Sequence, residues 1–214
     1  MKPELFKRTI SSIFLMGLIF LSALINDYIF LSILFVVIIF SWIEWIKIIE
    51  KIRLKKIYYL IYIILFLIYL LMAFIISFNV FLIDKYFFMT ILMICIFSDI
   101  GGYVFGKTFK GKKLTKISPN KTISGSIGSF ILSYIGFFVI YFYFNDLLFV
   151  RLEIVVLVFT PFFISFVCQL GDLFISYFKR KAKIKNTGNI IPGHGGLLDR
   201  IDGAIFALPI GFII

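Results

Sequence analysis

The chain has 214 residues, of which 62% are hydrophobic and only 15% are charged. An ordinary soluble domain has about 25% charged residues, so the composition excludes a soluble enzyme, a disordered chain and a secreted disulfide scaffold. Apolar runs reach the roughly 20 residues that are needed to cross a bilayer core. The sequence therefore predicts an all-α, polytopic integral membrane protein.

Seven apolar stretches are expected to form membrane-spanning helices, because a backbone in lipid must satisfy its hydrogen bonds internally. In chain order they cover residues 10–25, 28–44, 57–82, 86–105, 123–144, 154–178 and 203–214. The last stretch is short enough to be a half-span. Residues 42–56 alternate aromatic, aliphatic and basic side chains. They are either an amphipathic helix on the membrane surface or a span end followed by a basic loop.

The basic residues are distributed unevenly along the chain, whose net charge is +11. Of the 22 lysines and arginines, 20 fall in residues 1–9, 45–56, 106–122 and 179–202. With seven spans and a cytoplasmic N-terminus, all four segments lie on the cytoplasmic side, as the positive-inside rule requires. The sequence thus predicts an integral membrane protein whose basic loops face the cytoplasm.

Two acids lie away from the ends of predicted spans, where an ionisable residue is a functional hypothesis by default. Asp99 precedes Lys107, and Asp172 precedes Lys179, by seven or eight residues. At ~1.5 Å per residue, both carboxylates are expected roughly 10–12 Å from the cytoplasmic edge. This common depth predicts a polar cavity that opens inward. The alternative is two unrelated buried acids, each paired with a basic residue.

A second group of polar residues surrounds the only histidine, His194, which lies in a glycine-rich turn. Asp199 and Asp202 are spaced i, i+3 and project from one face if a helix begins before them. Carboxylates without a histidine cluster suit Mg²⁺, and glycines such as Gly195 and Gly196 let backbone N–H groups approach an anion. His194 is interpreted equally well as a phosphate contact or as a structural residue. The pattern indicates phosphoryl or nucleotidyl transfer that involves a lipid.

Residues 176–202 resemble the C-terminal signature of the phosphatidate cytidylyltransferase (CDP-diacylglycerol synthase) family. Residues 98–122 and 169–172 resemble two further blocks of that family, so the resemblance covers roughly residues 95–205. Two positions differ, because Asn186 stands where the family usually has Asp and Ser124 where it usually has Glu. The signature positions are filled by Ser176, Phe178, Lys179, Arg180, Lys185, Gly188, Pro192, His194, Gly195, Gly196, Leu197, Asp199, Arg200, Ile201 and Asp202.

The resemblance implies a nucleotidyltransferase that converts CTP and phosphatidate to CDP-diacylglycerol and pyrophosphate. It divides the chain into N-terminal membrane helices (1–94) and a catalytic membrane region (95–214). The implied catalytic residues are Asp172, Lys179, Arg180, His194, Asp199, Arg200 and Asp202. The implied substrate-binding residues are Asp99, Ser118, Asn120, Lys121, Thr122, Ser176, Lys185, Gly195 and Gly196.

The implied cofactor is Mg²⁺ or Mn²⁺ bound by Asp172, Asp199 and Asp202, with a monovalent cation such as K⁺ as an additional partner. The expected partners are CTP, phosphatidate and the lipid bilayer, without nucleic acid, and a homodimer is left open. Three other functions are considered. They are a CTP-dependent polyprenol or phytol kinase, a cytidylyltransferase for another lipid phosphate, and a transporter of an anionic solute.

Overall fold

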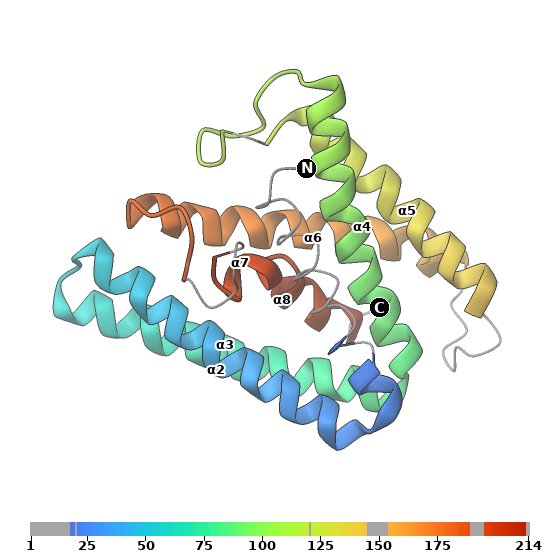
Figure 1. The fold of residues 1–214 in the computed structure, drawn as a ribbon, viewed down its shortest axis with the longest axis horizontal. Coiled ribbons are helices and arrows are strands. Elements are labelled where there is room, and N and C mark those ends of the chain that lie inside the picture. The colour runs from blue at the N-terminus through green and yellow to red at the C-terminus, as the bar shows by residue number, and fades with distance from the viewer. Residues whose placement is uncertain (1–17, 20, 120, 145–153, 189–194, 213–214) are drawn as a thin grey trace, which may run out of the picture. The chain divides into compact units, whose positions relative to one another are not determined.

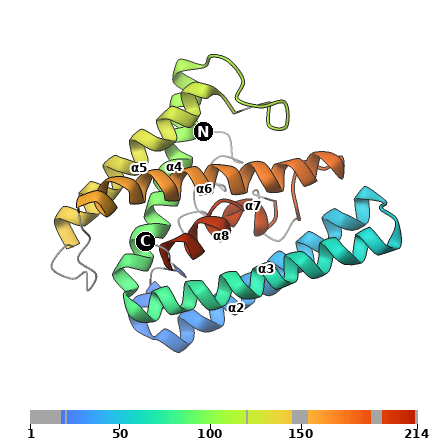
Figure 2. The same ribbon diagram turned by 180° about the vertical axis from the view of Figure 1, so that it is seen from behind.

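The computed structural model describes residues 18–19, 21–119, 121–144, 154–188 and 195–212 (Figure 1). Within these ranges every long element is a helix, which confirms the all-α prediction. The two views in Figures 1 and 2 show the order of the helices. They are α2 (Asp27–Ile52), α3 (Lys56–Ile83), α4 (Lys85–Phe109), α5 (Ile123–Phe144), α6 (Ile154–Lys181), α7 (Leu198–Ile201) and α8 (Ala204–Ala207), followed by the 3-10 helix η2 (Leu208–Phe212).

Five of the described helices, α2 to α6, are long and apolar enough to cross a membrane. They correspond to the second to sixth predicted spans. The first predicted span, 10–25, falls mostly outside the described residues. Within the described part, the last stretch forms the short α8 and η2, and the seventh predicted span stays a prediction.

The end of α2 differs from the prediction by several residues. The helix continues past residue 44 to Ile52, and Arg53 then adopts a left-handed conformation with φ 55°. Its N–H bonds to the Glu50 carbonyl, which closes the last turn. Residues 42–52 are therefore the end of a long helix, and a separate amphipathic surface helix does not form.

Two of the helices begin at side-chain caps that the short polar connections supply. Asn26 accepts a hydrogen bond from the backbone N–H of Tyr28 at the start of α2. Asp84 accepts bonds of 2.9 Å from the N–H groups of Tyr86 and Phe87 at the start of α4. Such caps satisfy N–H groups that have no partner within the helix.

The described chain forms two compact units. The first contains residues up to Phe74 and residues 178–201, and the second contains residues 75–177 and those from Asp202 onward. The boundaries fall inside α3 and α6. The division expected at residue 94 separates the chain by its motifs and not by its compactness. It is therefore not comparable with these two units and stays a prediction.

The first unit is built on α2 and the beginning of α3, which run antiparallel. The Trp45 indole N–H donates to the Tyr62 carbonyl at 3.1 Å, and the Trp45 ring stacks on Phe66 with centroids 4.1 Å apart. Phe178 contacts Trp45 edge-on at 4.7 Å. An aromatic cluster therefore joins both helices to the end of α6.

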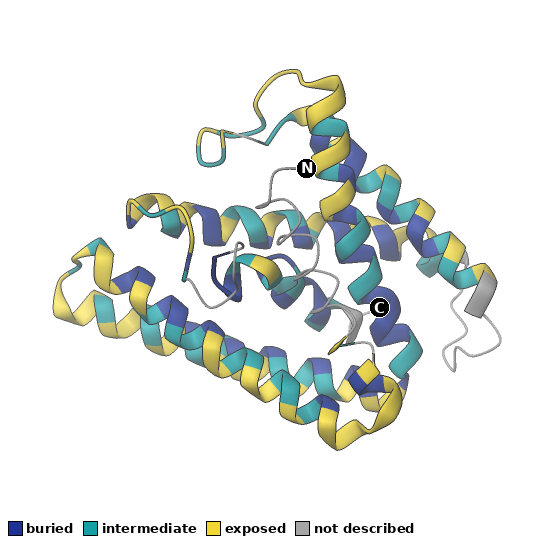
Figure 3. Ribbon diagram, in the orientation of Figure 1, coloured by how far each residue is buried: buried dark blue, intermediate teal, exposed yellow. Residues whose placement is uncertain are grey.

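Exposed residues run along the long helices (Figure 3), and many of them carry large apolar side chains. Examples are Ile61 and Leu65 on α3, and Ile131 and Ile135 on α5. Exposed apolar surface on this scale is unusual for a soluble monomer. It suits helices that face lipid.

The second unit contains a close contact between α4 and α5 that depends on small residues. A side chain at Gly101 would collide with the Gly128 backbone, and one at Gly128 would collide with Phe105. Ser129 donates a 2.7 Å hydrogen bond to the Ser98 carbonyl across the same contact. Small residues and interhelical hydrogen bonds are the usual means of joining helices in lipid.

The Gly128→Ala variant is expected to be less stable by about 1–3 kcal/mol, because the added methyl group has no space against Phe105. The measurement is the midpoint of thermal unfolding of the purified protein in detergent. Val139→Ile is the matched control, since it also adds one methyl group to α5 but at a position that is 50% exposed. Equal midpoints for the two variants would contradict close packing at Gly128.

Candidate active site

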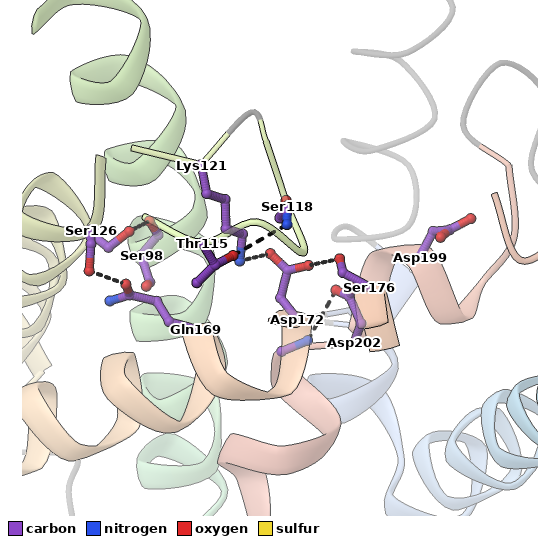
Figure 4. A network of polar contacts seen from close by, with 12 residues as sticks. Ser98, Thr115, Ser118, Lys121, Ser126, Gln169, Asp172, Ser176, Asp199 and Asp202 are labelled. Carbon is purple, nitrogen blue, oxygen red and sulfur yellow. Dashed lines mark hydrogen bonds and ion pairs between the residues drawn. The ribbon is translucent and has the colours of Figure 1, made fainter. Parts of the chain in front are cut away.

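Asp172 lies on α6 in the second unit and is about a quarter exposed (27% of its side chain). One of its carboxylate oxygens pairs with the ammonium group of Lys121. The other accepts a 3.3 Å hydrogen bond from Ser176, one turn further along α6. Figure 4 shows Lys121 and Ser176 on either side of this carboxylate.

Lys121 reaches Asp172 from the segment that connects α4 to α5. Within this segment Leu114 donates to the Lys121 carbonyl at 2.8 Å, and Lys121 donates to the Ser118 carbonyl at 3.0 Å. Thr122 accepts a 3.1 Å bond from the Gly125 N–H and so caps α5. Three predicted substrate-binding residues, Ser118, Lys121 and Thr122, therefore belong to one ordered turn beside α6.

A row of hydroxyl and amide groups continues along α6 from Asp172 (Figure 4). Gln169 accepts a 2.6 Å bond from Ser126 on α5. Ser165, one turn earlier, lies 2.9 Å from Ser98 of α4. Three helices of the second unit thus share a continuous set of polar contacts.

Asp202 lies beside the turn of α6 that carries Asp172 (Figure 4). It is 9% exposed and accepts a bond from the Gly203 N–H. The approach is close because Gly171 has no side chain: a Cβ there would lie 2.7 Å from the Asp202 carbonyl oxygen. The chain thus brings two of the three predicted metal-binding acids to one stretch of α6.

Asp99 is exposed on α4, one helical turn after Cys95. Asp172 likewise follows Cys168 by one turn of α6, and both cysteines are buried. The shared cavity stays a prediction.

Asp199 belongs to the first unit, where it closes the segment between α6 and α7. Its Oδ1 pairs with Lys179 at 2.7 Å, and both side chains are largely buried, at 7% and 12% exposed. Its Oδ2 accepts bonds from the backbone N–H groups of Thr187 at 2.8 Å and Gly196 at 3.1 Å. Gly195, which precedes Gly196, has a φ of +95°, a backbone conformation that favours glycine.

The remaining residues that were named from the sequence divide into three groups. Arg180, Lys185 and Arg200 are exposed. His194 and Asn120 lie outside the described residues. Of the two positions that differ from the family, Asn186 packs near Gly195, and Ser124 bonds to the Lys110 carbonyl and, at 3.0 Å, to Thr122.

One buried acid was missed by the sequence analysis. Glu44 is on α2, is fully buried and accepts hydrogen bonds from residues of the α6–α7 segment. The signal was available, because Glu44 is an acid at the end of an apolar stretch, between Trp42 and Trp45. The stretch was considered only for its relation to the membrane surface.

The donor set at Asp172 and Asp202 suits a hard divalent cation. Mg²⁺ prefers oxygen ligands and commonly takes one or two protein carboxylates, with water and phosphate oxygens completing its shell. Asp172 also has the Ser176 hydroxyl beside it. Among the residues that the structure describes, no three His, Cys, Asp or Glu side chains form a metal-binding cluster. The set of Asp172, Asp199 and Asp202 stays a prediction.

The apolar helices and the polar contacts between them define an integral membrane protein with polar chemistry among its helices. The chain belongs to the Cytidylyltransferase family, whose sequence profile matches residues 51–214. This confirms the resemblance and extends it toward the N-terminus beyond residue 95.

Similar proteins named phosphatidate cytidylyltransferase occur in several bacteria. The chain is 44% identical to that of Rickettsia bellii over 126 residues, which cover 54% of this chain and 52% of the relative. It is 44% identical to that of Staphylococcus haemolyticus over 114 residues, covering 53% and 42%. For Helicobacter pylori the identity is 40% over 117 residues, covering 54% and 42%. The chain thus spans about half the length of the curated relatives it matches.

Proposed function

We propose that the protein is a phosphatidate cytidylyltransferase, which converts CTP and phosphatidate to CDP-diacylglycerol and pyrophosphate. The proposal rests on the ion pair between Lys121 and Asp172, which lies beside Asp202, in a chain of the Cytidylyltransferase family. The relatives that bear this name support the choice of substrate class. The row of hydroxyl groups beside the acids supplies further groups that can bind phosphate.

In the proposed reaction an oxygen of the lipid phosphate attacks the α-phosphorus of CTP. The new P–O bond forms as the bond to the β-phosphate oxygen breaks, and pyrophosphate leaves in line. The phosphatidate phosphate is already an anion at neutral pH, so no strong general base is required. Lys121, Lys179, Arg180 and Arg200 bind phosphate oxygens and offset the charge on the leaving group. His194 donates a hydrogen bond to phosphate in the same proposal.

The proposed cofactor is Mg²⁺ or Mn²⁺, held by Asp172 and Asp202 with Asp199 as a third acid, and K⁺ is a candidate second ion. A divalent cation would supply charge neutralisation between the acids and the nucleotide phosphates. The chain's own contribution is to hold these carboxylates in place. Lys121 and Ser176 do so for Asp172, and the Gly203 N–H does so for Asp202.

The test of the function is an assay of the purified protein with CTP labelled in the α-phosphate, with and without phosphatidate. The proposal expects labelled CDP-diacylglycerol and stoichiometric pyrophosphate. Release of CDP with a polyprenol or phytol acceptor would instead identify a CTP-dependent lipid kinase. Product formation only with another lipid phosphate would identify a different cytidylyltransferase substrate.

We also propose seven spans, a cytoplasmic N-terminus and a site that faces the cytoplasm of a bacterial inner membrane. Single cysteines at Lys112 and Lys183, which are exposed, are expected to react with an impermeant thiol reagent only from the cytoplasmic side. A cysteine at Asp27, which is exposed at the start of α2, is expected to react only from outside. The native Cys95 and Cys168 are buried, which limits background labelling.

Labelling of positions 112 and 183 from opposite sides would overturn this topology, because the Lys121 turn and the Asp199 segment would then face different compartments. Labelling of position 27 from the cytoplasm would overturn the orientation of α2. A cysteine at Asn145, in the connection between the fifth and sixth predicted spans, is also expected to react only from outside, and this position lies outside the described residues.

A further inference from the structure

Glu44 is a fully buried acid on α2, a helix that carries no predicted site residue. Its Oε1 accepts a hydrogen bond from the Leu197 N–H at 2.9 Å, and its Oε2 accepts one from the Leu198 N–H at 2.9 Å. The Thr187 hydroxyl donates to Oε2 at 2.5 Å. All three donors belong to the α6–α7 segment and to the first unit.

The segment approaches Glu44 so closely that two glycines are required. A Cβ at Gly188 would lie 2.7 Å from Oε1 of Glu44. A Cβ at Gly196 would collide with both the Thr187 hydroxyl and Oε2 of Glu44. Gly196, the second of the two glycines after His194, is therefore needed for contact with this acid. The sequence alone did not reveal this structural reason for the glycine.

Glu44 and Asp199 both accept hydrogen bonds from the same turn. Thr187 donates its backbone N–H to Asp199 and its hydroxyl to Glu44. Along the chain, the Gly196 N–H bonds to Asp199, whereas the next two N–H groups, of Leu197 and Leu198, bond to Glu44. The position of Asp199 is thus fixed by a turn whose other contacts end on Glu44.

Given the cytidylyltransferase function proposed above, we propose that Glu44 is a positioning residue for the reaction. It holds the turn at residues 187 and 196–198, so that Asp199 and its partner Lys179 keep their places. Glu44 itself does not touch substrate, because its side chain is fully buried. It also lies outside residues 51–214, the part of the chain that the family profile matches.

The Glu44→Gln variant tests this role, because Gln keeps the shape but replaces one acceptor oxygen by an NH₂ donor. That group would face an N–H or hydroxyl donor, so at least one bond is lost. Altering a residue that supports a metal ligand typically lowers activity by about 10- to 100-fold. We expect kcat per folded protein to fall by that factor, with a smaller change in KM for CTP.

Hydrogen–deuterium exchange of the full-length protein provides a readout that is independent of turnover. In Glu44→Gln, peptides that contain Leu197 and Leu198 are expected to exchange faster than in the wild type. Glu50→Gln is the matched control, since Glu50 is an exposed acid on the same helix. The described hydrogen bond of its side chain is the one that it accepts from the Tyr59 hydroxyl, at 3.3 Å. This variant should change neither kcat nor exchange.

Each outcome bears on the role of Glu44. Faster exchange together with lower kcat supports it, whereas unchanged exchange, or faster exchange with normal kcat, overturns it. If Glu44→Gln does not fold, Thr187→Val removes a single donor and is expected to give the same two effects to a smaller extent. If the wild type does not turn over CTP, the proposed function fails. The exchange rates then still decide whether Glu44 holds the turn.

Discussion

Asp172→Asn is expected to lower kcat by about 100-fold or more while leaving expression and membrane insertion intact. Asn keeps the shape of the side chain and removes its charge. The variant would lose the ion pair with Lys121 and the anionic oxygen that accepts from Ser176. CTP brings about four negative charges to acids that would repel it without a cation between them. The measurement is steady-state turnover of labelled CTP at a series of Mg²⁺ concentrations.

The control for this variant removes a charge outside the proposed site. Lys183 is exposed and has φ 54°, a left-handed conformation that Asn tolerates well, so Lys183→Asn should keep the wild-type rate. Chelation of divalent metal is expected to abolish turnover by the wild type, and added Mg²⁺ or Mn²⁺ to restore it. Normal rates in the chelated protein or in Asp172→Asn would show that this acid is structural.

Asp199→Asn is expected to reduce turnover by about 100-fold as well, for a different physical reason. Asp199 accepts from Lys179 through one oxygen and from two backbone N–H groups through the other. Asn must place an NH₂ group against one of these sets of donors. Because Lys179 is largely buried, leaving it without a partner also costs stability, by about 1–3 kcal/mol. Turnover and the thermal midpoint of the same preparation measure the two effects.

Asp27→Asn is the matched control for Asp199→Asn. It makes the same substitution at an exposed acid in the first turn of α2, where only a small change in stability is expected. A variant at Asp199 that turned over at the control's rate would contradict a role for this carboxylate in the reaction.

The helices were predictable because lipid leaves the backbone no other way to satisfy its hydrogen bonds. The expected span at 57–82, for example, is observed as Lys56–Ile83. The end of α2 was less predictable, because the pattern that ends a span does not end a helix. Residues 45–52 are more basic but contain nothing that breaks helical geometry, so the helix continues to Arg53.

The contacts of the site were only partly predictable. Asp172, Asp199 and Asp202 were selected as acids of interest by their places in the chain, and their roles stay predictions. Which partner each one meets was not accessible, since neither periodicity nor spacing relates Lys121 to Asp172. The contact between Glu44 and Leu197 joins residues 153 positions apart. Long-range pairs of this kind follow from the packing of whole helices, which one sequence does not reveal.

The glycine and serine contact between α4 and α5 also determines where Lys121 is placed. The segment that carries Lys121 begins at the end of α4 and ends at the start of α5, so its two anchor points are fixed by how closely these helices approach each other. Widening the contact near Gly128 would separate the anchors and draw the ammonium group away from Asp172. Residues that meet only other helices in the bilayer therefore control the charge environment of a carboxylate that they never touch.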